Sequence, residues 1–396
     1  MPLDLLLAAT SLGAWLYLIF GHGRFWAADQ RLDAAPEPAV WPAVVAVVPA
    51  RNEADVIGRT LGSLLDQDYP GRLRIVLADD ESDDGTGAAA QRAAAAHRHG
   101  ERLLLEPTKP RPPGWVGKMW AVHSGVQRAG QEAPDAAYLL LADADVAHSA
   151  GNLRGLVAKA EAERLDLVSL MVLLTAETPW ERLVVPAFVY FFQKLYPFPR
   201  VNDPRSRVAA AAGGCMLVLR SALERAGGIE PLRGEIIDDC ALGRALKRGG
   251  PIWLGLSRSE RSIRGYGGLG GVWRMVARSA FTQLQHSWLL LAGTLLGLAL
   301  LYLAPPLLAL GALWGIGGAA ACLGAAAWIL MAASFVPTLA LYGRAPAWGF
   351  ALPVAGALYA AMTFDSARRH GRAQGAEWKG RAGAGSADAA GSGGAR

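Results

Sequence analysis

Apolar and polar positions divide the chain into unlike parts. Residues 3–20 and 288–364 carry almost no charge, whereas residues 40–265 mix apolar and polar positions as a globular domain does. An uncharged apolar run of about 20 residues is long enough to cross the hydrocarbon layer of a membrane as a helix. The pattern therefore predicts a globular domain between two membrane segments, with the boundaries 1–26, 40–262 and 287–365.

Residues 3–20 predict a membrane anchor that stays on the mature protein. No basic segment precedes this run and no A-x-A cleavage site follows it. Residues typical of the membrane surface occur toward its end, namely Trp15, Tyr17, Arg24 and Trp26. The alternative is a cleaved signal peptide, which would have a similar apolar core.

The C-terminal apolar region is long enough for three spans. Residues 288–341 accommodate two and residues 347–364 a third, while Pro305 and Pro306 give one segment a reason to be re-entrant. Three full spans after a cytosolic domain would export the tail, yet the positive-inside rule keeps it in the cytosol. We expect the charge rule to prevail, on the basis of Arg368, Arg369, Arg372, Lys379 and Arg381.

Two shorter segments flank these regions. Residues 263–286 mix apolar side chains such as Trp273 and Phe281 with basic ones, which predicts an amphipathic helix on the membrane surface. Residues 366–396 begin with basic positions and end in Gly, Ala and Ser, which predicts a disordered tail.

Inside residues 40–262, short apolar runs alternate with helical segments. The predicted strands lie at 44–50, 72–79, 102–106 and 137–145, and the predicted helices at 53–65, 85–97 and 119–129. This alternation predicts an α/β fold with a mostly parallel sheet covered by helices on both faces. Ligands of such folds bind at the carboxyl ends of the strands, so the site is expected where the polar residues after the strands converge.

The charges and cysteines of the chain indicate which kinds of partner and compartment to expect. The net charge of +5 is modest, and anionic lipid head groups account for the basic residues beside the apolar segments without any nucleic acid. Those basic residues are Arg24, Arg261, Arg264, Arg274, Arg278, Arg368, Arg369 and Arg372. The three cysteines, Cys215, Cys240 and Cys322, follow no disulfide or zinc spacing and suit a reducing compartment.

The predicted strand at 137–145 ends in two carboxylates separated by one residue. Asp143 and Asp145 can both reach one divalent cation and, through it, a diphosphate, and Mg²⁺ or Mn²⁺ suits such oxygen ligands. The alternative is a solvated surface turn, in which D-x-D is also common. The apolar run YLLLA before the pair favours the metal, because acids at the end of a buried strand need a partner.

A second acid cluster follows the strand at 72–79. One of Asp83 and Asp84 is expected to cap the next helix, which is the ordinary role of an acid at that position. Capping does not explain Asp79 and Asp80, which lie at the end of the strand itself.

Three more charged residues precede predicted helices. Asp238 and Asp239 either interact with a helix dipole or supply a general base for an acceptor hydroxyl. Burial and repulsion from Asp238 would both raise the pKa of Asp239 toward values useful for a base. Lys118 lies in a Gly-rich loop, and it either binds a phosphate together with backbone N–H groups or is an ordinary surface lysine.

These motifs in this order resemble the family 2 inverting glycosyltransferases of GT-A fold, over about residues 42–286. The resemblance implies that VPARNE (48–53) and Asp79 contact the nucleoside. It also implies that Asp143 and Asp145 serve the ribose and the metal, and that Asp239 is the base. The expected donor contacts are Pro49, Arg51, Glu53, Asp79, Asp80, Lys118 and Asp143.

A narrower resemblance is to the hopene-associated branch of that family. It rests on GWVGKMWA (114–121), GGCMLVLR (213–220), RSAFTQL (278–284) and WKGR (378–381). The accessory site candidates are Asp238, Arg278, Gln283 and Trp378. Processive synthases of the family carry Q-x-x-R-W where this chain has WRMVARSAFTQL, and His123 replaces an Asn found in many relatives.

The sequence thus predicts a metal-dependent membrane glycosyltransferase that transfers one sugar, with inversion, from a UDP-sugar to a lipid of hopanoid or polyprenyl type. The expected location is a bacterial-type cytoplasmic membrane, with the catalytic domain facing the cytosol and no protein partner. Two alternatives stay open, a processive polysaccharide synthase and a membrane subunit that binds a nucleotide sugar without catalysis. Intramembrane charge would favour the second, and none occurs at 288–341.

Overall fold

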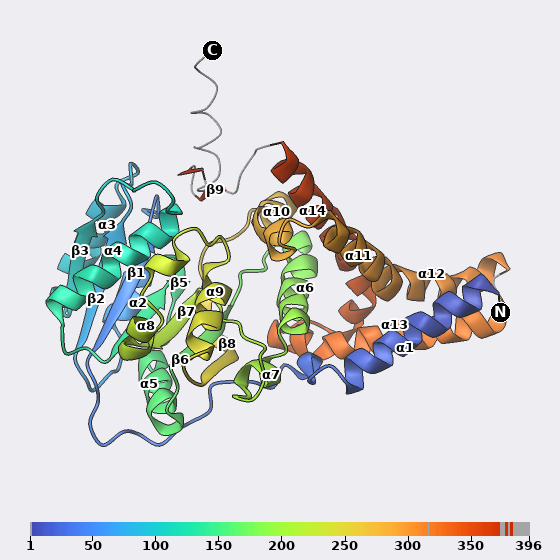
Figure 1. Ribbon diagram of the computed structural model, residues 1–396, viewed down its shortest axis with the longest axis horizontal. Coiled ribbons are helices and arrows are strands. Elements are labelled where there is room, and N and C mark those ends of the chain that lie inside the picture. Colours follow the sequence, from blue (N-terminus) through green and yellow to red (C-terminus); the bar gives the residue numbers. More distant parts are fainter. Residues whose placement is uncertain (1, 316, 373–376, 379–380, 383–396) are drawn as a thin grey trace, which may run out of the picture. The chain divides into compact units, whose positions relative to one another are not determined.

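The computed structural model describes residues 2–315, 317–372, 377–378 and 381–382, and the chain in it forms two compact units (Figure 1). The α/β unit comprises Gln30–Thr175 and Val201–Arg264. The helical unit comprises Met1–Asp29, Ala176–Arg200 and Gly265–Gln374. Each unit is described by itself below.

An eight-stranded sheet forms the centre of the α/β unit, in the order β3-β2-β1-β4-β7-β6-β8-β5. The neighbours from β3 to β4 are parallel, as are β6 and β8, whereas β7 is antiparallel to both of its neighbours and β5 is antiparallel to β8. The strands are β1 (Val44–Ala50), β2 (Leu73–Asp79), β3 (Leu103–Pro107), β4 (Tyr138–Ala142), β5 (Val146–Ala147), β6 (Leu167–Leu173), β7 (Cys215–Leu219) and β8 (Ile252–Ser262).

Strand β1 shows why this sequence forms a buried parallel strand. All seven of its residues are buried, as expected for a β-branched run covered on both faces. Val44, Ala46 and Val48 belong to one core cluster with helix α2 (Ile57–Leu65). On the other face helix α4 (Gly117–Glu132) approaches so closely that a Cβ at Gly125 would lie 2.5 Å from Val47.

Helix α3 (Thr86–Ala95) lies within the predicted 85–97. The α/β unit also contains α5 (Asn152–Glu163), α8 (Arg220–Arg225) and α9 (Asp238–Lys247), which follow the part of the chain where the alternation was predicted. Strand β4 ends at Ala142, so Asp143 and Asp145 lie in the turn after the strand, which is shorter than the expected 137–145.

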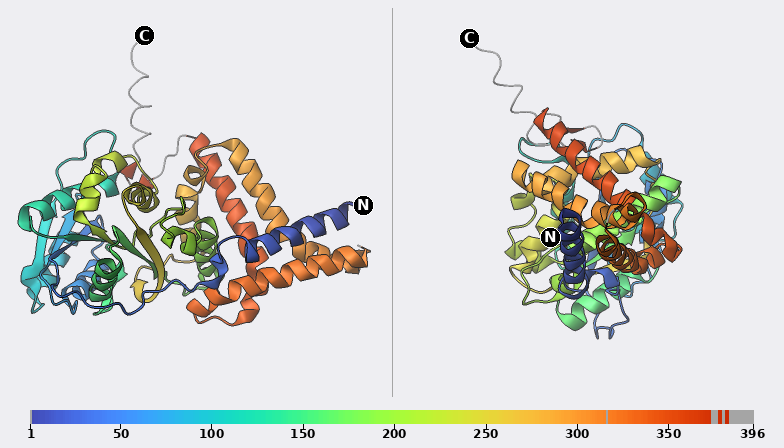
Figure 2. Two further views of the ribbon diagram at one scale, coloured as in Figure 1. Left: turned by 60° about the horizontal axis from the view of Figure 1, so that its bottom comes forward. Right: turned by 90° about the vertical axis from the view of Figure 1, so that its right-hand side faces the viewer.

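Among the described residues, four helices of the helical unit are long and apolar enough to cross a membrane (Figure 2). They are Leu3–Phe20 (α1), Trp288–Trp314, Gly318–Leu341 (α13) and Pro346–Gly371. The second of them contains α11 (Trp288–Leu298), the π-helical turn η4 (Ala299–Leu303) and α12 (Ala304–Gly311). The last contains η6 (Pro346–Ala351) and α14 (Leu352–Gly371).

Pro305 and Pro306 do not interrupt the helix that contains them. In the π turn before them each N–H would bind the carbonyl five residues earlier, so the two prolines leave the carbonyls of Leu300 and Leu301 without a helical donor. Helix α1 supplies the missing donors. Ser11 Oγ donates to the Leu300 carbonyl at 2.9 Å, and Trp15 Nε1 donates to the Leu301 carbonyl at 2.8 Å.

Residues 176–200 group with the helical unit, although the predicted globular domain ran through 40–262. They contain α6 (Pro179–Leu195), whose central residues are apolar and buried. Two of its polar residues face α13, where Tyr190 hydrogen-bonds Ser334 at 2.6 Å and Gln193 Nε2 donates to Thr338 at 3.3 Å. The predicted domain 40–262 therefore included a segment, 176–200, that belongs to the helical unit.

The predicted surface helix and the predicted tail lie on either side of the C-terminal apolar helices in the sequence. Helix α10 (Leu269–Gln283) lies within the expected 263–286. Most of the predicted disordered tail lies outside the described residues. Within the described part, Glu377–Trp378 (β9) and Arg381–Ala382 (β10) pair as two short antiparallel strands.

Candidate active site

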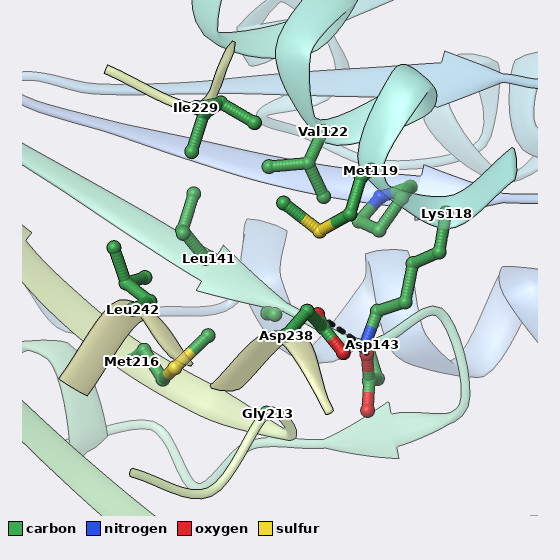
Figure 3. A pocket seen from close by; sticks show the side chains of 12 residues that line it. Lys118, Met119, Val122, Leu141, Asp143, Gly213, Met216, Ile229, Asp238 and Leu242 are labelled. Atoms are coloured by element: carbon green, nitrogen blue, oxygen red, sulfur yellow. Dashed lines mark ion pairs between the residues drawn. The ribbon is translucent and has the colours of Figure 1, made fainter. Parts of the chain in front are cut away.

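A pocket in the α/β unit lies where strands β1 and β4 end (Figure 3). Apolar side chains form one wall, and charged side chains from α4, the turn after β4 and the start of α9 form the other. The lining residues are Pro49, Lys118, Met119, Val122, Leu141, Ala142, Asp143, Gly213, Met216, Ile229, Asp238 and Leu242. Residues from distant parts of the sequence thus meet at the edge where an α/β sheet binds ligands.

Lys118 holds the charged side of the pocket together. It lies in the first turn of α4, and its Nζ is 3.0 Å from Asp143 Oδ1 and 3.3 Å from Asp238 Oδ2 (Figure 3). Burial alone would lower the pKa of Lys118, but the surrounding carboxylates outweigh it and raise the pKa above its ordinary value. Lys118 is therefore a fixed positive charge at neutral pH.

Asp239 lies half-buried beside this group, at the start of α9. Its Oδ2 accepts the Gly213 N–H at 3.0 Å and its Oδ1 accepts the Cys240 N–H at 2.7 Å. Burial, followed by repulsion from Asp238, raises the pKa of Asp239 to about 6, while Lys118 and the two N–H donors act in the opposite direction. The pKa of Asp239 is thus raised by burial and by Asp238, as the sequence predicted, and the carboxylate is still ionised at neutral pH.

Arg264 pairs with a second group of acids. Its Nη2 donates to Glu53 and, at 2.8 Å, to Asp55, while its Nε lies 3.9 Å from Asp145 Oδ2. The sequence interpretation of Arg264 as a lipid contact did not anticipate these carboxylate partners. The pairing of β5 with β8 brings Arg264, which follows β8, close to Asp145, which precedes β5. The position of Arg264 just after β8 is the one feature from which these contacts could have been predicted.

The remaining predicted donor residues join the ends of β1 and β2. Arg51 donates to the backbone carbonyls of Asp80 and, at 3.0 Å, Glu81. The Asp80 side chain is fully buried with Thr108 Oγ1 at 3.3 Å, and Asp79 accepts the Ser82 N–H at 3.2 Å. These contacts make Arg51 and Asp80 a structural support for the loop, with the more accessible Asp79 at its edge.

The N-cap of α3 is Gly85, not one of the two acids expected there, and Asp84 lies one residue before it. Its Oδ1 accepts the N–H of Thr86, the first residue of the helix, at 2.9 Å, and its Oδ2 accepts the Ala54 N–H at 3.0 Å. Burial would raise the pKa of Asp84, but these hydrogen bonds lower it overall. This acid therefore connects the loop after β1 to α3.

The accessory candidates do not all gather at the pocket. Asp238 lines it, whereas Arg278 and Gln283 lie on α10 of the helical unit, where Gln283 donates to Tyr196 Oη at 2.8 Å. The backbone of Trp378 forms part of β9, and its side chain lies outside the described part of the structure. His123 packs between Trp115 and Trp120, with ring centroids 4.7 and 5.5 Å away.

The acids of the pocket suit a metal that the substrate helps to hold. Within the described residues, no cluster of three or more His, Cys, Asp or Glu side chains is arranged for a metal ion. Mg²⁺, however, is commonly bound by one or two carboxylates together with substrate phosphates and water. Asp143 and Asp145 are hard oxygen donors in one turn, so their chemistry fits such a site.

A family comparison assigns most of the α/β unit. Residues 45–227 match the family model described as glycosyl transferase family 2. That match covers less than half of the chain, so it shows a similarity of this segment to the family. An N-acetylglucosaminyltransferase of Rhizobium leguminosarum bv. viciae is 32% identical to this chain over 130 residues. That match covers 31% of this chain and 29% of the relative, so the chain matches less than a third of that protein's length.

Solved structures of similar fold extend this comparison. The mannosyltransferase PcManGT from Pyrobaculum calidifontis was solved with GDP-Man and Mn²⁺. It is 21% identical to this chain, with a TM-score of 0.54. The match covers 90% of this chain and 97% of the mannosyltransferase. TarS of S. aureus is similar at 15% identity and a TM-score of 0.40, over 61% of this chain and 40% of TarS.

These findings confirm the predicted fold class, a GT-A-like α/β domain with a mostly parallel sheet and apolar helices at both ends of the chain. They also support the predicted enzyme class, glycosyltransferase, for the domain at 45–227. The resemblance to the hopene-associated branch and the role of each site residue stay predictions.

Proposed function

We propose that the protein is a membrane-bound glycosyltransferase that moves one sugar from a UDP-sugar to a hydroxyl of a lipid acceptor, with inversion. The observation that carries the proposal is the group formed by Asp239, Lys118 and Asp143 at the strand ends of a family 2 domain. It combines a carboxylate whose pKa lies near 6 with a fixed cation and a metal-binding acid. These are the parts that an in-line displacement at C1 of the sugar requires.

Asp239 is the proposed general base. Inversion needs an acceptor oxygen behind C1 and a group that takes its proton as the new bond forms. A carboxylate with a pKa near 6 is ionised at neutral pH and is more basic than an ordinary aspartate. The hydrogen bonds from Gly213 and Cys240 hold the carboxylate in one orientation, which favours a defined acceptor position.

The leaving diphosphate is the proposed partner of Lys118 and of a divalent metal. Negative charge grows on the diphosphate as the bond to C1 breaks, and the Lys118 ammonium can stabilise that charge. Asp143 and Asp145 would hold Mg²⁺ or Mn²⁺, which would supply further neutralisation when bound. Pro49, Arg51, Glu53, Asp79 and Asp80 are proposed to shape the nucleoside end of the site.

Two donors are worth testing first. The Rhizobium relative is an N-acetylglucosaminyltransferase, which makes UDP-N-acetylglucosamine the first donor to try. The mannosyltransferase of similar fold was solved with GDP-Man, so GDP-mannose is the second. Uracil stays the proposed nucleobase of the donor, because the family resemblance implies that Asp79 contacts the nucleoside.

A lipid acceptor follows from the helices around the domain. The four apolar helices would keep the domain at a membrane surface, where hydroxyls of hopanoid or polyprenyl lipids are concentrated. Because nucleotide sugars are made in the cytosol, we place the domain on the cytosolic face of a bacterial-type cytoplasmic membrane. A processive synthase remains the second candidate, although the chain lacks the Q-x-x-R-W signature at 273–284.

Donor turnover by the purified full-length protein tests the proposal. The protein in lipid nanodiscs is incubated with Mn²⁺ and a panel of UDP-sugars and GDP-mannose, with and without a bacterial lipid extract. We expect release of UDP that depends on the lipid, together with a lipid product bearing one added sugar. Products carrying many sugars would instead establish a processive synthase, and nucleotide binding without any turnover would establish a non-catalytic subunit.

A further inference from the structure

Each acid of the D-x-D pair has a basic neighbour from the chain itself. Lys118 Nζ lies 3.0 Å from Asp143, and Arg264 Nε lies 3.9 Å from Asp145. The Lys118 contact is the closer of the two, and it links Asp143 to Asp238 across the mouth of the pocket (Figure 3). The lysine therefore occupies the position of a counter-ion to the proposed metal ligand.

A divalent cation that approaches Asp143 must compete with this ammonium. Two cations on one carboxylate repel each other, and the repulsion is strong at a partly buried site, where water screens it poorly. The ammonium lies 3.0 Å from Asp143 and 3.3 Å from Asp238, so two carboxylates hold it in this position. The metal alone should therefore bind weakly.

A donor diphosphate removes this competition. It carries at least two negative charges, and Lys118 lies in the first turn of α4, where backbone N–H groups also favour an anion. The flexible four-carbon side chain lets the ammonium move to the phosphates without any change in the backbone. That movement frees an oxygen of Asp143 for the metal.

We propose that Lys118 is an internal counter-cation that occupies Asp143 until a donor diphosphate draws it away, so that the donor and the divalent metal bind cooperatively. This inference rests on the proposed function of the site. By linkage, the factor by which the donor tightens metal binding equals the factor by which the metal tightens donor binding. The enzyme therefore assembles its metal site only when a donor is present.

Mn²⁺ titrations of the full-length protein test the proposal without measuring turnover. Free Mn²⁺ is followed by electron paramagnetic resonance, with and without UDP, for the wild type, Lys118→Met and Lys118→Arg. For the wild type we expect UDP to tighten Mn²⁺ binding at least about tenfold, within the usual range of coupling between sites. For Lys118→Met we expect Mn²⁺ alone to bind about tenfold tighter than to the wild type, with most of the UDP effect lost.

Lys118→Arg retains the charge and should bind Mn²⁺ alone as weakly as the wild type does. The matched control is Lys109→Met, which removes an exposed cation outside the pocket and should leave both titrations unchanged. Unchanged or weaker binding of Mn²⁺ alone to a folded Lys118→Met protein would overturn the inference. Failure of the wild type to bind UDP even with Mn²⁺ would instead contradict the proposed function itself.

Discussion

At the scale of single residues, the site is a balance of charges. Four acids, Asp143, Asp145, Asp238 and Asp239, gather at the strand ends, and their mutual repulsion is offset by two basic side chains, Lys118 and Arg264. The same balance sets the proton affinity of Asp239, because burial and Asp238 raise its pKa while Lys118 lowers it. Function at this site should therefore respond both to pH and to loss of any one charge.

The pH dependence of transfer should report Asp239. A base acts only when ionised, so kcat/KM should fall about tenfold per pH unit below pH about 6, the value to which the pKa of Asp239 is raised. The measurement is a profile of kcat/KM from pH 4.5 to 8, with UDP affinity followed over the same range as the control. An acid limb near pH 4, where an ordinary aspartate titrates, would contradict the role of burial.

Asp145→Ala should weaken the response to metal. The substitution removes one oxygen ligand from a site for a hard cation, so we expect Mn²⁺ to increase UDP affinity about tenfold less than in the wild type. Isothermal titration of UDP with and without Mn²⁺ measures this. A matched control is Asp55→Ala, which also removes a carboxylate beside Arg264 but lies outside the D-x-D pair. An unaltered metal response in Asp145→Ala would exclude Asp145 as a ligand.

The candidate site was predictable from sequence where it depends on strand ends. Asp79, Asp143 and Lys118 could be placed because each follows a buried strand or starts a helix in a strictly alternating pattern. The contacts of Arg264 could not, because they depend on β8 joining the sheet beside β5 through an antiparallel pairing that hydropathy does not encode.

At the scale of elements, side chains of α1 supply hydrogen bonds to backbone carbonyls that Pro305 and Pro306 cannot bond. Pairing of Ser11 and Trp15 with the carbonyls of Leu300 and Leu301 allows Trp288–Trp314 to continue past Pro305. Sequence patterns identified the helices themselves but not this pairing, because it joins residues almost 300 positions apart. For the same reason the predicted globular domain at 40–262 included α6, although Tyr190 and Gln193 of this helix bond to α13.

Trp15→Phe should destabilise the helical unit by about 1 kcal/mol. It removes the Nε1 donor and leaves the Leu301 carbonyl unpaired in apolar surroundings, at the modest cost measured for such bonds between membrane helices. Thermal unfolding in detergent, read by the loss of the monodisperse peak, measures the effect. Trp314→Phe, the same change at a residue that is 77% exposed, is the control. Equal melting of the two variants would show that the Trp15 bond contributes nothing.

At the scale of the whole molecule, contacts within the helical unit bear on its topology. The last turns of α14 lie beside α10 and the start of α11, where Trp273 Nε1 donates to Asp365 at 2.8 Å and Ser366 accepts the Phe281 N–H at 3.0 Å. His286 and His370 stack there with centroids 4.1 Å apart. The two ends of the C-terminal apolar region therefore lie side by side within the helical unit.

Three full spans would place those two ends on opposite sides of a membrane. We propose Pro346–Gly371 as a segment that returns to the side it entered, since η6 packs against the middle of α13, with Trp328 Nε1 3.3 Å from the Phe350 carbonyl. Helix α14 also runs crosswise to α1 and α13 (Figure 1). In the sequence, Pro305 and Pro306 favoured a re-entrant segment, whereas the packing of η6 and α14 points to Pro346–Gly371 instead. Two of the basic residues behind the positive-inside argument, Arg368 and Arg369, pair with Asp365.

We therefore predict that the tail faces the cytosol. Single cysteines placed near Gly375 and Ser386, which lie outside the described residues, are treated with an impermeant reagent in intact cells, in a background without the native cysteines. We expect labelling only after the cells are opened. A cysteine near Trp314, at the far end of the second apolar helix, is the control that should label from outside. Rapid labelling of the tail in intact cells would mean three true spans.

The central claim is that this domain transfers a sugar with Asp239 as the base, and single-turnover transfer by Asp239→Asn tests it most directly. The substitution keeps the shape of the side chain but removes its basicity, so transfer from a radiolabelled UDP-sugar to lipid should fall at least about 10²-fold. UDP and Mn²⁺ affinities, measured on the same preparation, should stay close to those of the wild type. Undiminished transfer by a variant that still binds UDP would contradict the account.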